Sequence, residues 1–97
     1  MTGVELIAQE RQRQIEEEKY DREGDKYYNL NEELANAAVC YALPRHCREY
    51  NEFSNPVLWP WHRRYWKPTP NDRTRELVKA GALIAAEIDR LQSLGAE

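Results

Sequence analysis

All five prolines of this 97-residue chain fall between residues 44 and 70, which separates two proline-free arms by a long connection. Proline fixes its φ angle and lacks a backbone N–H donor, so it ends helices and is excluded from the middle of sheets. Both arms carry apolar residues at helical spacing. We therefore expect an all-α protein that forms a single helical domain over residues 1–97.

Three segments show the helical period and predict helices over about residues 3–18, 31–43 and 72–94. Residues 19–30 show no period, and we expect them to form a loop. The proline-rich region 44–70 also holds six of the ten aromatic residues, which is typical of ordered rather than disordered segments. We therefore expect this long loop to be ordered and to carry short helical turns.

Capping signals precede the first two helices. Thr2 and Glu5 form a Thr-x-x-Glu capping box, and Asn29 with Glu32 three positions later is a second signal of the same kind. Pro44 cannot continue a helix and is expected to stop the second one. These signals set the expected helix boundaries.

The helix expected over residues 31–43 has small side chains on one surface, because Ala35, Ala38 and Ala42 lie on neighbouring turns. Another helix can approach such a surface closely. Gly81 stands in the middle of the third helix, where a glycine costs about 1 kcal/mol relative to alanine. We expect close packing of the segment Lys79-Ala80-Gly81-Ala82 against these alanines to offset that cost.

Arg11 lies on the apolar stripe of the first helix, between Ile7 and Ile15. A cation on the buried side of a helix needs an anionic partner or must reach the rim of the protein. Arg11 therefore either pairs with an internal carboxylate, which is the alternative we favour, or points into a ligand pocket.

Residues 59–68 read Trp-Pro-Trp-His-Arg-Arg-Tyr-Trp-Lys-Pro and contain all three tryptophans of the chain. Aromatic faces beside guanidinium groups recognise nucleobases and phosphates through stacking, cation–π contacts and charge-assisted hydrogen bonds. Tryptophans also fill small cores, and that structural alternative stays open for Trp59 and Trp61. The expected ligand-binding residues are Trp59, Trp61, Arg63, Arg64, Tyr65, Trp66, Lys67, Arg73 and Arg11.

The start of the helix expected over residues 72–94 offers free backbone N–H groups and the positive end of the helix dipole. In one arrangement, Arg64, Lys67 and Arg73 converge there on a phosphate while an indole stacks on the attached base. In the alternative arrangement, Asp72 caps the helix itself and leaves no anion site.

The net charge of −3 hides a locally basic middle, because residues 44–70 carry five Lys or Arg against two Asp or Glu. That patch is too small to follow a long nucleic-acid backbone and suits a small anion better. No apolar run approaches the roughly 20 residues that a membrane span needs. The N-terminus lacks the features of a signal peptide, so we expect a cytoplasmic protein with reduced cysteines.

The titratable residues form no recognisable catalytic or metal-binding pattern. The expected helices carry no Glu-x-x-Glu pair of the kind that holds magnesium in helical nucleotide pyrophosphohydrolases. Cys40 and Cys47 match no usual zinc spacing, and we expect Cys40 to be a buried thiol. We therefore assign no catalytic residue, no metal and no cofactor.

Several motifs together resemble a family of small phage and prophage accessory proteins. They are Glu10-Arg11-Gln12-Arg13-Gln14-Ile15, Trp59-Pro60-Trp61, Tyr65-Trp66-Lys67-Pro68 and Leu77-Val78-Lys79-Ala80-Gly81-Ala82-Leu83-Ile84. The resemblance spans nearly the whole chain and implies an all-α fold in a phage-encoded protein. The proline-rich turn before Asp72-Arg73, with the helix after it, also resembles the RyR domain.

The resemblance carries an expectation about function, because small phage proteins often counter host defences. Some of them sequester cyclic or ADP-ribose-type nucleotides as oligomers. It therefore implies a homo-oligomer in the cytoplasm of an infected bacterial host that binds a small nucleotide-type immune signal without chemistry. Two alternatives remain open: an inhibitor that binds a host defence protein through exposed tryptophans, and a magnesium-dependent nucleotide pyrophosphohydrolase.

Overall fold

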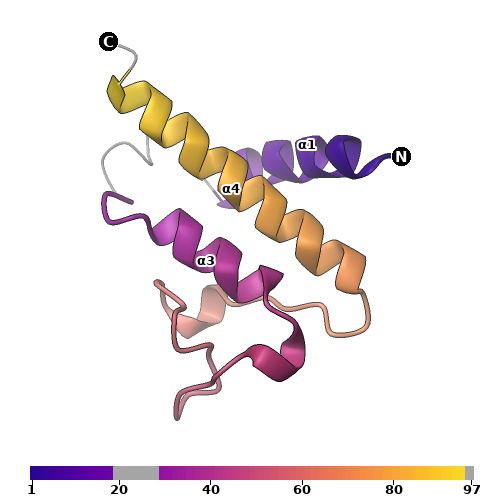
Figure 1. Ribbon diagram of the computed structural model, residues 1–97, viewed down its shortest axis with the longest axis vertical. Coiled ribbons are helices and arrows are strands. Elements are labelled where there is room, and N and C mark those ends of the chain that lie inside the picture. The colour runs from indigo at the N-terminus through magenta and orange to yellow at the C-terminus, as the bar shows by residue number, and fades with distance from the viewer. Residues whose placement is uncertain (19–28, 96–97) are drawn as a thin grey trace.

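Three helices form the frame of the protein. A computed structural model describes residues 1–18 and 29–95 and contains α1 (Gly3–Arg13), α3 (Glu33–Ala42) and α4 (Arg73–Gly95) (Figure 1). No β-strand occurs in the two described ranges. The prediction of an all-α fold with three helices is therefore confirmed.

α1 begins at the capping box that the sequence predicts. The Glu5 backbone N–H donates to the Thr2 hydroxyl at 3.2 Å, and the Thr2 N–H donates to the Glu5 carboxylate at 2.7 Å. The chain continues beyond α1 as a π-helical turn over Gln14–Glu18. Helical structure therefore reaches residue 18, although its last turn is wider than an α-helical one.

The capping signal expected at Asn29 and Glu32 is wrong. Glu32 precedes α3 with a left-handed φ of 60° and makes no capping hydrogen bond through its side chain. Asn29 is buried, and its side-chain oxygen accepts a hydrogen bond from the Trp61 indole at 3.2 Å. The Asn29 side chain therefore accepts a hydrogen bond from a residue 32 positions further along the chain and does not cap α3. The loop expected over residues 19–30 lies outside the described residues except at its last two positions.

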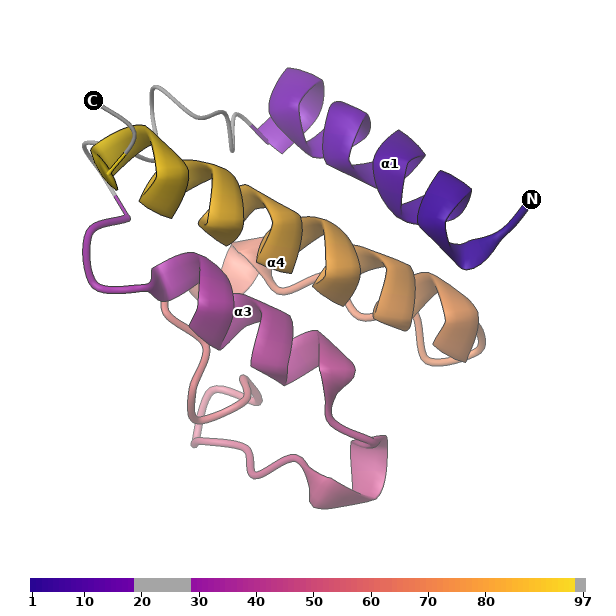
Figure 2. The ribbon, with the colours of Figure 1, turned by 45° about the horizontal axis from the view of Figure 1, so that its top comes forward.

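α4 lies between α1 and α3 and packs against both (Figure 2). Its N-terminus is capped by Asp72, whose carboxylate accepts a hydrogen bond from the Arg75 backbone N–H at 3.0 Å. The core is built mainly of small and medium apolar side chains from α3 and α4, which let the two backbones approach closely. Its members are Leu34, Ala37, Ala38, Cys40, Tyr41, Trp59, Ala80, Leu83 and Ala86.

Within the segment Lys79-Ala80-Gly81-Ala82, Ala80 lies in the same core cluster as Ala38 of α3, whereas Gly81 faces α1. A Cβ atom at residue 81 would lie 2.5 Å from Ile7 Cδ1 and 2.9 Å from Ile7 Cγ1. The missing side chain therefore makes room for α1, not α3. Burial of Ile7 against the α4 backbone offsets the conformational cost of a glycine inside the helix.

The proline-rich segment 44–70 leaves the end of α3, passes below it and returns to the start of α4 (Figure 1). It contains two 3-10 turns, at Arg45–Cys47 and Arg63–Tyr65, and an isolated bridge that pairs Tyr50 with Pro56. Its tryptophans contact the core formed by α3 and α4. No helix in the described ranges is both long and apolar enough to cross a bilayer.

Candidate functional site

Trp59 belongs to the core. Its side chain is 9% exposed, and its indole N–H donates to the His62 carbonyl at 3.2 Å. The ring meets Tyr41 edge to face at a centroid distance of 5.7 Å, and Trp61 and Trp66 pack against it at 5.3 and 5.1 Å. Edge-to-face packing of this kind stabilises aromatic clusters. For Trp59 the core-filling alternative is therefore the one that the geometry supports.

Trp61 and Trp66 are only partly buried and line the outer side of this aromatic cluster. Trp66 lies 4.7 Å from the Tyr41 ring, and the buried Arg48 guanidinium lies 5.4 Å from its centroid. Trp61 packs against the core and also contributes to the lining of a surface hollow described below. These two indoles differ from Trp59, because each combines a packed side with an accessible one.

The cations expected at the start of α4 do not converge. Arg73 turns back to α3, where its guanidinium donates to the carbonyl oxygens of Tyr41 at 2.8 Å, Leu43 at 3.2 Å and Ala42. Helix C-termini present unpaired carbonyl groups, which explains why this cation is drawn there. Asp72 caps α4, so the arrangement observed is the alternative in which the start of this helix offers no anion site.

The other two cations are also engaged elsewhere. Lys67 pairs with Glu18 at 3.2 Å, which ties the proline-rich segment to the end of the first helical stretch. Arg64 is exposed and donates to the hydroxyl of the neighbouring Tyr65 at 2.9 Å, with its guanidinium 4.9 Å from that ring. Arg11 pairs with Asp89 of α4 at 3.2 Å, as the favoured alternative predicts.

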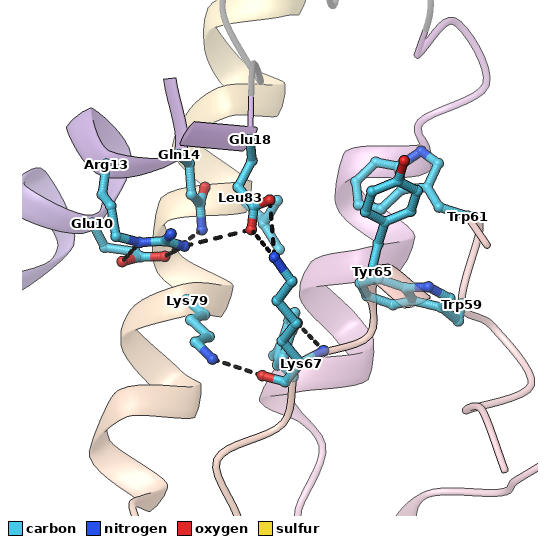
Figure 3. A pocket seen from close by; sticks show the side chains of 11 residues that line it. Glu10, Arg13, Gln14, Glu18, Trp59, Trp61, Tyr65, Lys67, Lys79 and Leu83 are labelled. Atoms are coloured by element: carbon cyan, nitrogen blue, oxygen red, sulfur yellow. Dashed lines mark hydrogen bonds and ion pairs between the residues drawn. The ribbon is translucent and has the colours of Figure 1, made fainter. Parts of the chain in front are cut away.

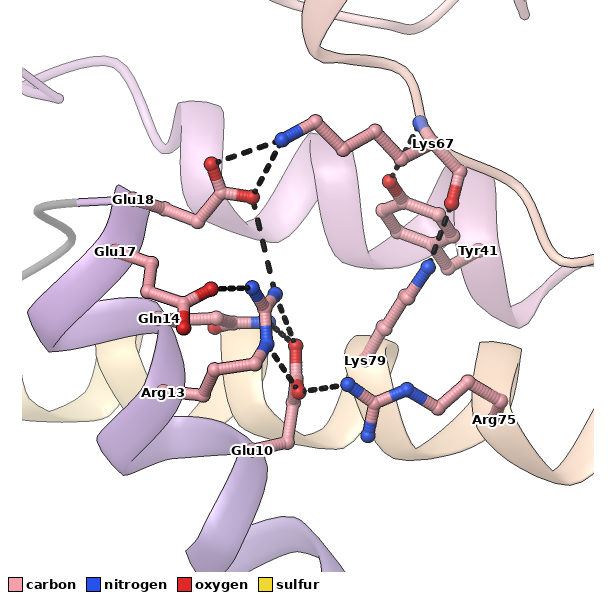
Figure 4. Close-up of polar contacts among 9 residues, drawn as sticks. All are labelled: Glu10, Arg13, Gln14, Glu17, Glu18, Tyr41, Lys67, Arg75 and Lys79. Atoms are coloured by element: carbon pink, nitrogen blue, oxygen red, sulfur yellow. Dashed lines mark hydrogen bonds and ion pairs between the residues drawn. The ribbon is translucent and has the colours of Figure 1, made fainter.

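A buried polar network connects α1 with α4 (Figure 4). At its centre the Glu10 carboxylate receives two hydrogen bonds from Arg13 at 2.8 Å, one from Gln14 at 3.0 Å and one from Arg75. Burial alone raises the pKa of Glu10, but the hydrogen bonds and the charges of Arg13 and Arg75 outweigh it and hold the pKa below its ordinary value of 4.5. Glu10 is therefore an ionised, fully paired carboxylate.

Beside this network lies a small, partly open cavity of about 20 Å³, which we call the polar cavity (Figure 3). It is lined by Glu10, Arg13, Gln14, Glu18, Tyr41, Trp59, Trp61, Tyr65, Lys67, Lys79 and Leu83. A volume of this size holds a single water molecule and excludes a nucleobase. Four of the expected ligand-binding residues, Trp59, Trp61, Tyr65 and Lys67, therefore line a cavity that has room for little more than a water molecule.

Lys79 closes one side of the polar cavity. Its ammonium donates to the Lys67 carbonyl at 2.6 Å and lies 5.5 Å from the centroid of the Tyr41 ring. Burial, and then the charge of Arg75, lower the pKa of Lys79. Burial also raises the pKa of Tyr41 to about 12. Both groups are structural, because each of them holds the proline-rich segment against the helices.

An open hollow of about 270 Å³ lies on the outer face of the proline-rich segment. Its lining combines two aromatic rings, an amide, an imidazole and a guanidinium, supplied by Phe53, Trp61, Asn55, His62 and Arg63. The Arg63 guanidinium lies 5.4 Å from the centroid of the Phe53 ring. We call this feature the loop hollow; it contains two of the expected ligand-binding residues, Trp61 and Arg63.

Sequence reasoning missed the other three side chains of the loop hollow. Phe53 and Asn55 reach it because the turn before them folds back: the Asn51 side-chain oxygen accepts hydrogen bonds from their backbone N–H groups at 2.9 and 3.2 Å. Asn51 followed by Ser54 and Asn55 is a turn signal that is legible in the sequence. His62 lies beside Arg63 in the tryptophan block, although it is not one of the expected ligand-binding residues.

A third hollow, of about 300 Å³, lies beside the end of α3. Its lining is mainly apolar, with one buried arginine and one glutamate, and consists of Cys40, Leu43, Cys47, Arg48, Glu49, Pro56, Val57 and Leu58. Cys40 is buried, as the sequence predicts, and Cys47 is exposed. Arg48 is already bound by protein groups, so this hollow offers little to fix a polar ligand in one orientation.

The acidic residues nearest the helix interfaces are paired with arginines. Glu87 accepts two hydrogen bonds from Arg90 at 2.7 and 2.8 Å, and Glu76 pairs with Arg48 at 2.9 Å. Within residues 1–18 and 29–95, no group of three His, Cys, Asp or Glu side chains is placed to hold a metal ion. No family model, curated protein or solved structure matches this chain.

Proposed function

We propose that the protein binds a small nucleotide-type ligand in the loop hollow and performs no chemistry on it. The observation that carries this proposal is the lining of the loop hollow, in which Phe53 and Trp61 supply flat rings beside the Arg63 guanidinium. Stacking of one base on an aromatic side chain contributes about 1–3 kcal/mol. The volume of about 270 Å³ lies near the lower end of small-molecule pockets and suits one nucleoside unit.

The polar groups of the loop hollow divide into two chemical roles. The Asn55 amide offers both a donor and an acceptor, as the edge of a base requires. Arg63 is an exposed cation of the lining that suits a phosphate at the mouth of the hollow. A ligand that carries a base and a phosphate satisfies both roles at once.

The biological setting that we propose is sequestration of a nucleotide-type immune signal in a bacterial host infected by phage. It rests on the resemblance to small phage accessory proteins and on a lining that suits binding. A binding protein of this kind needs no catalytic base. The best-buried carboxylates of the described chain, Glu10 and Glu76, are already held by arginines and would be poor ligands for magnesium.

A second candidate is inhibition of a host protein through the same segment. Phe53, Val57 and Leu58 are 57%, 56% and 51% exposed and lie close together in the sequence. Exposed aromatic and aliphatic side chains beside arginines are common anchors of protein interfaces. This candidate requires no small ligand.

Binding of cyclic dinucleotides, cyclic trinucleotides and ADP-ribose, measured by isothermal titration calorimetry, tests the proposal. We expect one of these compounds to bind, and Phe53→Ala and Arg63→Ala each to weaken its binding at least tenfold. Arg45→Ala is the matched control, because Arg45 is an exposed arginine of the same segment outside the loop hollow. Consumption of the compound with magnesium would identify an enzyme, and lack of binding across the panel would favour the protein-binding candidate.

A further inference from the structure

One face of α4 is apolar and half uncovered. Leu77, Ile84, Ile88 and Leu91 are 47%, 49%, 50% and 49% exposed. With Gly81 between the first two, their spacing is four, three, four and three residues. This is the 3.5-residue period of helices that pair along their length. We call these four side chains the α4 stripe.

The α4 stripe carries no charge, although 32% of the residues of the chain are charged. The charged residues elsewhere on α4 are tied to partners within the chain: Arg75 to Glu10, Glu76 to Arg48, Glu87 to Arg90 and Asp89 to Arg11. Depletion of charge is the compositional mark of the centre of a protein interface. A membrane surface is a poor match, because interfacial helices carry free lysines and arginines beside their apolar face.

The apolar surface continues from α4 onto α1. Ile7 rests on Gly81 within the α4 stripe, and Val4, one turn earlier on α1, is 78% exposed. A helix of 23 residues is roughly 35 Å long and about 10 Å wide, and α1 adds roughly half that length. The combined footprint is on the order of 500 Å², close to the ~600 Å² per partner at the low end of specific interfaces.

We infer that a second copy of this chain covers the α4 stripe, so that the protein is a two-fold dimer. A two-fold interface brings the same patch of both subunits together, which requires a self-complementary surface. The α4 stripe meets that requirement, because an antiparallel partner places Ile84 of each chain against Ile88 of the other. The same register brings Leu91 of each chain to Gly81 and to the Ile7 side chain that rests on it. Without charges along the seam, no like-charge pair opposes this arrangement.

Sedimentation equilibrium of the full chain between 1 and about 200 µM tests the inference, the concentration range being set by the micromolar affinity typical of small interfaces. We expect a mass of twice 11.5 kDa at the upper end and dissociation on dilution. The double variant Ile84→Asp, Ile88→Asp should be monomeric with an unchanged helical circular dichroism spectrum. The matched control, Val57→Asp with Leu58→Asp, changes exposed apolar residues outside the α4 stripe and should remain dimeric.

Leu77→Lys with Leu91→Lys provides a second test should the aspartate variant lose its helical spectrum. A wild-type protein that stays at 11.5 kDa throughout the range would overturn the inference, whether or not it sediments with vesicles or another protein. A dimer that persists in both folded stripe variants would overturn it as well, because the contact would then lie on another surface.

Discussion

The Arg48 guanidinium lies 2.9 Å from the Glu76 carboxylate, with side-chain exposures of 1% and 4%, and joins the proline-rich segment to α4. Arg48 also donates to the carbonyl oxygens of Cys40 and Tyr41 at 2.8 and 3.1 Å. It therefore connects the end of α3, the segment that follows it and the first turns of α4. Glu76 accepts a further hydrogen bond from the Thr69 N–H at 3.0 Å, which makes the carboxylate the common acceptor for this corner.

Replacement of Arg48 by alanine is expected to lower the free energy of unfolding by about 3–5 kcal/mol, because it leaves Glu76 buried without its main counter-charge. Urea denaturation followed by circular dichroism measures the change. Arg45→Ala, three residues away and exposed, should change stability by no more than about 0.5 kcal/mol. Equal effects of the two substitutions would contradict the importance of the buried pair.

Stability should fall in acid because of Glu10 and Glu76. Hydrogen bonds and charges from arginines, acting against burial, place the pKa of both carboxyl groups below 4.5 in the folded protein. A lowered folded-state pKa contributes stability that is present above pH 4.5 and is lost as the pH falls through the folded-state value. Urea denaturation at pH 7 and pH 3 should therefore show a marked loss for the wild type.

The variant Glu10→Gln isolates the contribution of Glu10 to the loss of stability in acid. The variant should be less stable than the wild type at pH 7 by about 1–3 kcal/mol, because charge-assisted hydrogen bonds from arginines are lost. It should also lose less stability between pH 7 and pH 3, since residue 10 no longer takes up a proton. A pH dependence identical to that of the wild type would mean that Glu10 titrates normally in the folded protein.

The two thiols should differ in reactivity. Burial raises the pKa of Cys40 to about 11, whereas Cys47 is exposed. Because the thiolate is the reactive form, iodoacetamide at pH 8 should label Cys47 quickly and Cys40 only after unfolding. Mass spectrometry of the labelled protein identifies the site. Rapid labelling of Cys47→Ser would show that Cys40 is accessible and would refute the assignment.

Gly81→Ala should be destabilising only while Ile7 is present. The added methyl group meets Ile7 within 2.5 Å, and forcing the side chain aside costs about 1–3 kcal/mol, more than the roughly 1 kcal/mol gained in helix propensity. In an Ile7→Ala background the same substitution should raise stability by about 1 kcal/mol. A double-mutant cycle measured by urea denaturation gives the coupling; additive effects would mean that α1 does not dock on Gly81.

The parts of the fold that follow from local sequence could be predicted, and those that depend on distant partners could not. The helix over 72–94 is legible because its apolar period is long, and the Thr2 capping box needs only residues three positions apart. Asn29 carries the same local signal, yet Trp61, far along the chain, takes its side chain. No sequence pattern around Asn29 or around Trp61 predicts that contact.

The same distinction explains the candidate site. The block of tryptophans and cations is visible in the sequence, but the acceptors that draw its cations away are not. Lys67 finds Glu18, and Arg73 finds backbone carbonyl groups of α3, which no side-chain pattern reveals. Trp61 and Arg63 stay together because the 3-10 turn that follows Trp61 is set by nearby residues.

Because Arg73 supplies the donors for the last carbonyl groups of α3, that helix is completed by the first residue of α4. During translation, the ribosome synthesises the residues of α3 well before it adds Arg73. Until translation passes residue 73, the carbonyl groups of Ala42 and Leu43 lack this donor, whereas the Tyr41 carbonyl can already accept a hydrogen bond from Arg48. We therefore expect the part of the chain before α4 to lack its complete native structure during synthesis, and the protein to finish folding only when α4 has been released.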